Sequence, residues 1–210
     1  MSDATQREVA RRMVAELKKR SANVVLVGST AVVALGLYPK SSKDADALGA
    51  PGLTLNEGRA LMQDIARELN LEYAELGWGT LAVFKAHGQG EALWRMDLLV
   101  PEEGPIPEKA AALIHARARR TDIGMSAIPE HIIVTKAVAH GDCLAKQDVE
   151  RARDYEQDLV ELRGALRAID EARVVELLDA YPDARRAPAI GLINETFGTR
   201  FQPPDDPSVA

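Results

Sequence analysis

The sequence of 210 residues is poor in aromatic side chains and contains a single cysteine. Because Phe, Trp and Tyr make up 4% of the chain, we do not expect a surface of stacked rings for single-stranded nucleic acid. One cysteine, Cys143, excludes an internal disulfide, and no Cys/His spacing typical of a zinc site accompanies it. We interpret Cys143 as a small apolar residue of a helix, not as a nucleophile.

Long apolar runs and an excess of positive charge are also missing. No stretch reaches the roughly 20 apolar residues that span a bilayer, and residues 2–12 lack the apolar centre of a signal peptide. The net charge of −6 argues against nonspecific duplex binding, although a local basic patch is compatible with it. These absences predict a cytoplasmic protein without a membrane partner, and no feature of the sequence indicates an oligomeric state.

The first hundred residues alternate between helical and strand patterns. Val9, Met13 and Leu17 recur at helical spacing, and the β-branched run 23–27 predicts a buried strand that Gly28 ends. Ser29 or Thr30 is expected to cap the helix that follows. Further strands are expected at 43–48, 71–76, 80–85 and 92–100, with a helix capped by Thr54 and Glu57 running to about residue 70.

The second half is predicted to be largely helical after a proline-rich connection at 101–107. Its helices are expected at 107–119, from Pro129 onward, and at 147–169, 170–181 and 184–197. The expected fold class is α/β (α+β), a mixed sheet with flanking helices followed by a helical C-terminal half. The expected domains are 1–101, 102–200 and a loose tail at 201–210.

Two aspartates on the strand expected at 43–48 carry the main functional signal. Asp44 and Asp46 are two residues apart, so on a strand they project from the same face. Two such carboxylates are unfavourable together unless a cation or a shared proton relieves them. The alternative is that they are solvated residues at the end of a strand.

A third aspartate, Asp97, lies inside the apolar run 93–100 and shares its strand face with Arg95. A buried, unpaired aspartate costs roughly several kcal/mol, so Asp97 must have a partner. Mg²⁺ shared with Asp44 and Asp46 would be one partner, because hard cations prefer oxygen ligands. Arg95 is the other candidate.

Gly28 and Ser29 follow the first strand where a helix is expected to begin. Exposed amides at a helix start bind anions, and the missing side chain of a glycine lets a phosphate approach the backbone. A glycine in this place also serves an ordinary turn. Neither a P-loop nor a dinucleotide-binding fingerprint is present.

Together these residues resemble the nucleotidyltransferase superfamily that includes DNA polymerase β. Its signature is an apolar residue, Gly and Gly or Ser, then Asp-apolar-Asp/Glu and a later acidic residue on a neighbouring strand. Here the signature corresponds to Val27-Gly28-Ser29, Asp44-Ala45-Asp46 and Asp97. The chain is most similar to small prokaryotic members, some of which are encoded as toxins in toxin–antitoxin or abortive-infection pairs.

The resemblance implies an enzyme that moves a nucleoside monophosphate from a ribonucleoside triphosphate to an acceptor hydroxyl and releases pyrophosphate. Two Mg²⁺ ions would be held by Asp44, Asp46 and Asp97, which are also the implied catalytic residues. The acceptor would be a protein, a tRNA end or a small molecule, and a cognate toxin or antitoxin would be a partner. The implied nucleotide-binding residues are Gly28, Ser29, Lys40, Ser42, Lys136 and Lys146.

Two alternatives stay open. The chain could be an inactive relative that keeps the fold as an interaction module, in which case Arg95 should neutralise Asp97 or the carboxylates should lie far apart. It could also be a structural or regulatory protein whose Asp44 and Asp46 merely end a strand. For Lys136 and Lys146, the competing interpretation is a solvated helix face.

Overall fold

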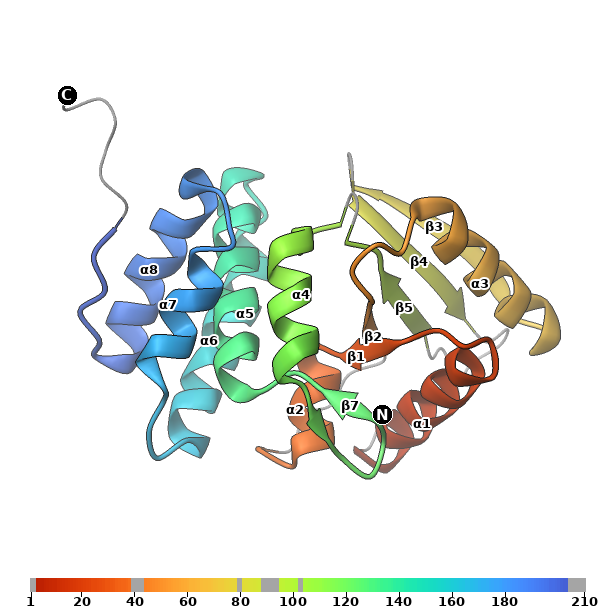
Figure 1. Ribbon diagram of the computed structural model, residues 1–210. Helices are drawn as coiled ribbons and strands as arrows, with labels where there is room; N and C mark the ends of the chain where they lie inside the picture. Colours follow the sequence, from red (N-terminus) through yellow and green to blue (C-terminus); the bar gives the residue numbers. More distant parts are fainter. Residues whose placement is uncertain (1–2, 39–43, 79–80, 88–94, 102–103, 204–210) are drawn as a thin grey trace. The chain divides into compact units, whose positions relative to one another are not determined.

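The computed structural model describes residues 3–38, 44–78, 81–87, 95–101 and 104–203, without the side chains of 3–6 and 76–87. It divides into two compact units, Met1–Ile128 and Pro129–Ala210. The helices and strands of the described residues (Figure 1) are α1 (Asp3–Lys19), β1 (Val24–Leu26), α2 (Gly28–Leu35), β2 (Asp44–Gly49), α3 (Leu55–Glu68), β3 (Glu72–Trp78), β4 (Leu81–His87), β5 (Arg95–Leu99), α4 (Glu108–Arg117), β6 (Arg119–Arg120), β7 (Met125–Ser126), α5 (Pro129–Ala145), α6 (Val149–Ala165), α7 (Glu171–Leu178) and α8 (Asp183–Phe197).

The described strands of the first unit form one sheet in the order β3-β4-β5-β2-β1-β7-β6. Strand β2 pairs with β5 in parallel, and β1 pairs with β7 in parallel. The remaining neighbours pair antiparallel. The predicted mixed sheet with flanking helices is therefore confirmed, and β2 and β5 lie side by side although more than forty residues separate them in the sequence.

One face of this sheet is buried under α1 and α3 (Figure 1). The apolar stripe of α1 that the helical spacing predicted, Val9, Met13 and Leu17, lies in this core. Alternate residues of the central strands point into it, because successive side chains of a strand lie on opposite faces. These strand residues are fully buried: Ala45, Ala47, Met96 and Leu98.

Helix α3 begins as predicted. The Thr54 hydroxyl accepts a hydrogen bond from the Glu57 amide at 3.3 Å, and the Glu57 carboxylate accepts one from the Thr54 amide at 2.9 Å. This capping box satisfies two backbone donors that the first helical turn would otherwise leave without a partner. Because the box fixes the start of α3, it also sets how the helix lies on the sheet.

Helix α2 begins earlier than predicted. Its N-terminal cap is Val27, and no side chain caps it, so the expectation that Ser29 or Thr30 would serve as the cap is wrong. Gly28 is the first residue of α2 and has a positive φ of 57°. The Thr30 hydroxyl instead accepts a hydrogen bond from the Asp46 amide at 2.8 Å. Thr30, which was predicted to cap α2, thus links the β1–α2 junction to β2.

The first unit ends after Ile128, not after residue 101 as the composition change suggested. Strand β7 pairs in parallel with β1, and the Ala127 amide donates to the Leu26 carbonyl at 2.9 Å. Helix α4 packs beside β1, and the His115 Nε2 lies 3.0 Å from the Gly49 carbonyl at the end of β2. These contacts attach residues 104–128 to the sheet.

The second unit contains α5 to α8, close to the ranges predicted. Its buried apolar residues include Ile132, Leu159, Leu177 and Ile193, one from each helix. Residues 201–203 have no regular secondary structure, and the rest of the predicted tail lies outside the described residues. Among the described helices, none combines the length and the apolar character that crossing a membrane requires.

Candidate active site

The paired strands β2 and β5 place three carboxylates on one face of the sheet. In their parallel register, Asp44 lies opposite Arg95, and Asp46 lies opposite Asp97. Paired residues of neighbouring strands share a face, so the predicted common face of Asp44 and Asp46 also includes Asp97. This is the face opposite the α1–α3 core. Asp97 is 4% exposed, and both Asp44 and Asp46 are partly exposed.

Gly28 lies directly against Asp46. A β-carbon added to Gly28 would lie 3.0 Å from Oδ2 of Asp46, which is tighter than ordinary van der Waals contact. The positive φ of Gly28 also disfavours any residue with a side chain. Two further hydrogen bonds hold the junction to Asp46: its amide donates to Thr30, and its carbonyl accepts from the Val27 amide at 3.2 Å. Position 28 therefore favours glycine for two reasons, the positive φ of its backbone and the close approach of the Asp46 side chain.

The start of α2 is therefore next to a carboxylate. Gly28 and Ser29 occupy the first turn of this eight-residue helix, and that turn contains no acidic residue. The amides of a first helical turn and the helix dipole attract anions. The arrangement places anion-attracting amides and cation-attracting carboxylates side by side, which suits a ligand that carries both phosphates and a bound cation.

Arg95 is the partner of two of the carboxylates. Its guanidinium donates a hydrogen bond to Oδ2 of Asp44, and its Nε lies 3.2 Å from Oδ2 of Asp97. The side chains of Asp44 and Arg95 are 28% and 31% exposed, whereas that of Asp97 is 6% exposed. Arg95, the second of the two predicted partners of Asp97, thus forms an ion pair with it through Oδ2.

The donor set has the chemistry of a magnesium site, but its side chains are not gathered into one. In the part of the chain that the structure describes, no group of three or more His, Cys, Asp and Glu side chains is arranged to hold a metal ion. Asp46 and Asp97 are nevertheless opposite one another on strands about 4.8 Å apart. Carboxylate oxygens are ligands that Mg²⁺ prefers, and one oxygen of Asp46 lies 3.0 Å from the place of a β-carbon on Gly28.

The other predicted nucleotide-binding residues lie elsewhere. Lys40 and Ser42 lie outside the described residues. Lys136 is buried in the second unit, where its ammonium group donates to Asp158 and lies 5.7 Å from the centroid of the Tyr155 ring. Lys146 is exposed just after the end of α5. The interpretation of Lys136 as part of a solvated helix face is wrong, because its side chain is buried against Asp158. The nucleotide roles of both lysines stay predictions.

Sequence reasoning missed two contributors to this site. Thr30 was interpreted as a helix cap, whereas it binds the Asp46 backbone. Arg95 was one of two candidate partners for Asp97, and its contact with Asp44 was not foreseen. The signal for that contact is the strand register, because Asp44 and Arg95 become neighbours once β2 and β5 pair in parallel. Spacing along one strand does not contain that information.

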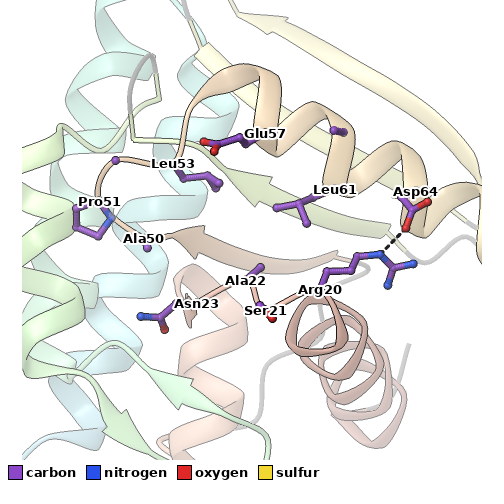
Figure 2. A pocket seen from close by; sticks show the side chains of 12 residues that line it. Arg20, Ser21, Ala22, Asn23, Ala50, Pro51, Leu53, Glu57, Leu61 and Asp64 are labelled. Carbon is purple, nitrogen blue, oxygen red and sulfur yellow. Dashed lines mark hydrogen bonds and ion pairs between the residues drawn. The ribbon is translucent and has the colours of Figure 1, made fainter.

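A pocket of about 630 Å³ lies at the other end of β1 and β2, between the end of α1 and the start of α3 (Figure 2). Arg20 is its most basic lining residue, and its guanidinium binds Asp64 at 2.7 Å and Glu16 at 3.0 Å. Glu68 accepts a third hydrogen bond from the same group. These three carboxylates surround Arg20, so the pocket presents a phosphate with acidic side chains beside its one basic group.

Comparisons with known proteins extend the description of the fold. No protein-family model matches the sequence, and no curated protein matches it. Among solved structures, the chain is similar to an antigenic nucleotidyltransferase-like protein from Paracoccidioides brasiliensis, with a TM-score of 0.55 and 13% identity. The similarity covers 93% of this chain and 90% of that one. The chain has a nucleotidyltransferase-like fold.

Two weaker likenesses accompany this one. The antibiotic-resistance factor ANT(2'')-Ia is 19% identical, with a TM-score of 0.47 over 83% of this chain and 90% of that chain. Terminal uridylyl transferase 4 from Trypanosoma brucei, solved with bound UTP, is 12% identical, with a TM-score of 0.34 over 85% and 60%. At TM-scores below 0.5, neither likeness extends the conclusion beyond the nucleotidyltransferase-like fold.

Proposed function

We propose that the protein is a nucleotidyltransferase that moves a nucleoside monophosphate from a ribonucleoside triphosphate to an acceptor hydroxyl and releases pyrophosphate. The observation that supports this most strongly is the position of Asp46. It pairs in register with Asp97 on the same face of the sheet, and it lies against Gly28, the first residue of α2. A triphosphate with its cation needs both halves of that arrangement: oxygen ligands for the cation and amides for the phosphates.

Asp44, Asp46 and Asp97 would hold two Mg²⁺ ions, which would supply Lewis-acid stabilisation of charge on the attacking and leaving oxygens. The residues of the α2 start, Gly28 and Ser29, would bind the β- and γ-phosphates through their amides and the Ser29 hydroxyl. Asp97, the most buried of the three carboxylates, would face the acceptor and take part in activating its hydroxyl.

In this reaction the acceptor oxygen forms a bond to the α-phosphorus, and the bond between that phosphorus and the α,β-bridging oxygen breaks. The hydroxyl proton leaves to a base, and the electron pair of the broken bond leaves with pyrophosphate. The contribution of the protein is positioning and charge stabilisation, which supply most of the rate in phosphoryl and nucleotidyl transfer. Lys40 and Ser42 would add contacts to the triphosphate or the acceptor.

The acceptor would be a protein side chain, a tRNA end or a small hydroxylated molecule. A role in a toxin–antitoxin pair would add a partner protein encoded beside this one. Both statements rest on the resemblance of the motif and not on a contact in the described residues.

Calorimetric titration with each of the four ribonucleoside triphosphates, with and without Mg²⁺, tests the proposal. We expect Mg²⁺-dependent binding of at least one of them. An Asp44→Asn/Asp46→Asn variant should lose that binding while keeping its fold. A matched control is Asp179→Asn/Asp183→Asn, two exposed aspartates of the second unit that bind Arg186. Absence of binding, or equal binding by the Asp44→Asn/Asp46→Asn variant, would rule the proposal out.

A second candidate function is an interaction module that has kept the fold without catalysis. The observation that favours it is Arg95, which pairs with Asp44 and contacts Asp97. A permanent guanidinium in this place would keep the carboxylates occupied. Titration with Mn²⁺ separates the two functions, because the interaction module predicts no specific divalent-cation binding even at saturating triphosphate.

A further inference from the structure

A strongly basic rim lies at the sheet edge farthest from β3. Strand β6 is the last strand of the sheet on this side and consists of Arg119 and Arg120, both exposed. Among the described residues neither arginine forms an ion pair. Arg117, at the end of α4, is exposed just before them. An edge strand made of two arginines therefore presents its guanidinium groups directly to solvent.

Helix α1 adds cations beside this edge. Asp122, in the turn between β6 and β7, accepts hydrogen bonds from Arg7 at 2.8 Å and from Arg11 at 2.5 Å. The same turn touches α1 a second time, because a β-carbon on Gly124 would lie 3.2 Å from the Val14 side chain. Lys18 is exposed about three turns after Arg7 and so lies on the same side of the helix.

We name the combined surface the basic edge; it consists of Arg7, Arg11, Lys18, Arg117, Arg119 and Arg120. The carboxylate bound within it is that of Asp122, and Glu8 lies on the next side of α1. The chain as a whole carries a net charge of −6, so this concentration of cations is opposite in sign to the rest of the molecule. Such a local field attracts polyanions even on an acidic protein.

We propose that the basic edge binds the phosphate backbone of a double-helical nucleic acid. Arginine forks bind phosphate oxygens in a bidentate manner, and the basic edge presents several such forks on neighbouring elements. Residues 116–126 contain no aromatic side chain, so stacking on unpaired bases is not available to this surface. Protein–nucleic acid interfaces are polar and positively charged, which matches the composition of the basic edge.

A protein partner fits this surface less well. Protein interfaces place aromatic and apolar side chains at their centre. The large apolar side chain that the hairpin exposes is Met125, at 39%. The cations of the basic edge surround it without forming an apolar centre. The inference concerns binding alone and is independent of the proposed nucleotidyl transfer.

A competing explanation is that the arginines protect the sheet edge. Charged residues on an edge strand prevent pairing with a second chain, and Arg119 and Arg120 would serve that purpose without any ligand. Charge sign separates the two explanations, because glutamates would protect an edge as well as arginines do. An Arg119→Glu/Arg120→Glu variant should therefore keep the oligomeric state of the wild type but repel a phosphate backbone.

Fluorescence anisotropy with a labelled RNA duplex and a DNA duplex of the same sequence, at several KCl concentrations, tests the proposal on the full chain. We expect binding whose affinity falls with salt, and Arg119→Gln/Arg120→Gln should reduce the slope of log K against log salt by about two. Arg163→Gln/Arg167→Gln, two exposed arginines of the second unit, is the control with the same change of charge and should leave the slope unchanged.

The two duplexes distinguish RNA from DNA, and tighter binding of either one supports the proposal. If the protein binds neither duplex, the proposal is overturned. An unchanged slope of log K against log salt in Arg119→Gln/Arg120→Gln would overturn it too. Equal binding to polyglutamate or to vesicles containing phosphatidylserine would also overturn it, because the surface would then recognise negative charge without a nucleic-acid backbone. Circular dichroism of each variant identifies any loss of binding that comes from misfolding.

Discussion

A β-carbon on Gly28 would lie 3.0 Å from Oδ2 of Asp46, so the carboxylate of Asp46 keeps its place only if residue 28 is a glycine. Gly28→Ala should force Asp46 to shift and should also incur the cost of a left-handed backbone, about 1–2 kcal/mol. We expect a lower free energy of unfolding in urea and weaker Mg²⁺–triphosphate binding by calorimetry.

Gly36→Ala is the matched control. Gly36 ends α2 with a φ of 65°, yet among the described residues, apart from its chain neighbours, no atom lies within 4 Å of its would-be β-carbon. Gly36→Ala should therefore lose a similar amount of unfolding free energy to the left-handed backbone conformation, and it should keep its triphosphate binding. If Gly28→Ala binds the triphosphate as well as Gly36→Ala does, the contact with Asp46 has no functional role.

Much of this site follows from local patterns. Alternation along a strand correctly placed Asp44 and Asp46 on one face, and the Thr54–Glu57 pair correctly marked the start of α3. These features depend on neighbours a few residues apart, which a sequence displays directly. The start of α2 was misjudged because Thr30 satisfies a donor on another strand, and a helix-capping rule considers only its own helix.

Features that depend on distant pairing could not be predicted. Strands β6 and β7 have two residues each, too few for any alternation to appear, so the first unit seemed to end near residue 101. These two strands form because β7 pairs in parallel with the edge of β1 that β2 does not occupy. The contact between Arg95 and Asp44 likewise arises only when β5 pairs with β2.

Arg95→Met should make the stability of the protein depend on divalent cations. Without the guanidinium, Asp44 and Asp97 lose a positive partner, and we expect the free energy of unfolding to fall by about 1–3 kcal/mol in the absence of metal. Added Mg²⁺ should restore more stability to this variant than to the wild type, because it relieves the same repulsion. Thermal unfolding with and without Mg²⁺ measures the difference.

The control for Arg95 is Arg59→Met, which removes an arginine that binds Glu75 at 2.6 Å on the surface of the same unit. Its unfolding should be insensitive to Mg²⁺. Equal sensitivity of the wild type, Arg59→Met and Arg95→Met would show that Arg95 does not compete with a cation. The nucleotidyltransferase proposal would survive that result if triphosphate binding still required Mg²⁺.

Lys136 should contribute to stability through Asp158. Both side chains are nearly inaccessible, at 4% and 6% exposure, so Lys136→Met leaves a buried carboxylate without its ammonium partner. Loss of one member of a buried pair costs about 3–5 kcal/mol. Urea unfolding should therefore detect a large loss for Lys136→Met and a smaller one for Lys136→Met/Asp158→Leu.

Lys146→Met tests whether this loss is specific, since Lys146 is exposed and its substitution should change the free energy of unfolding by less than about 0.5 kcal/mol. A small effect in Lys136→Met would show that the ion pair with Asp158 does not stabilise the second unit.

His115 should make the first unit less stable in mild acid. Its Nε2 donates to the Gly49 carbonyl at 3.0 Å, and burial lowers the pKa of the imidazole from its usual value of 6.5. The folded state therefore resists protonation, whereas the unfolded state takes up a proton near the usual pKa. The contribution of neutral His115 to the free energy of unfolding is fully present above pH 6.5 and is lost as the pH falls through the lowered pKa.

Urea unfolding from about pH 8 to about pH 5 measures this loss. His115→Gln keeps a donor for the Gly49 carbonyl but cannot titrate, so its unfolding free energy should depend less on pH over the same range. A variant with the same pH dependence as the wild type would assign the acid sensitivity to other groups.

The central claim is that the face carrying Asp44, Asp46 and Asp97 binds a metal–triphosphate complex beside Gly28. A crystal structure with Mn²⁺ and a nonhydrolysable ribonucleoside triphosphate tests it most directly, because the anomalous signal of Mn²⁺ locates the cation without interpretation of its ligands. We predict an anomalous peak bounded by the three carboxylates, phosphates at the start of α2, and Arg95 moved away from Asp44. A triphosphate bound elsewhere, or Arg95 still on Asp44 with no peak beside Asp46, would contradict the claim.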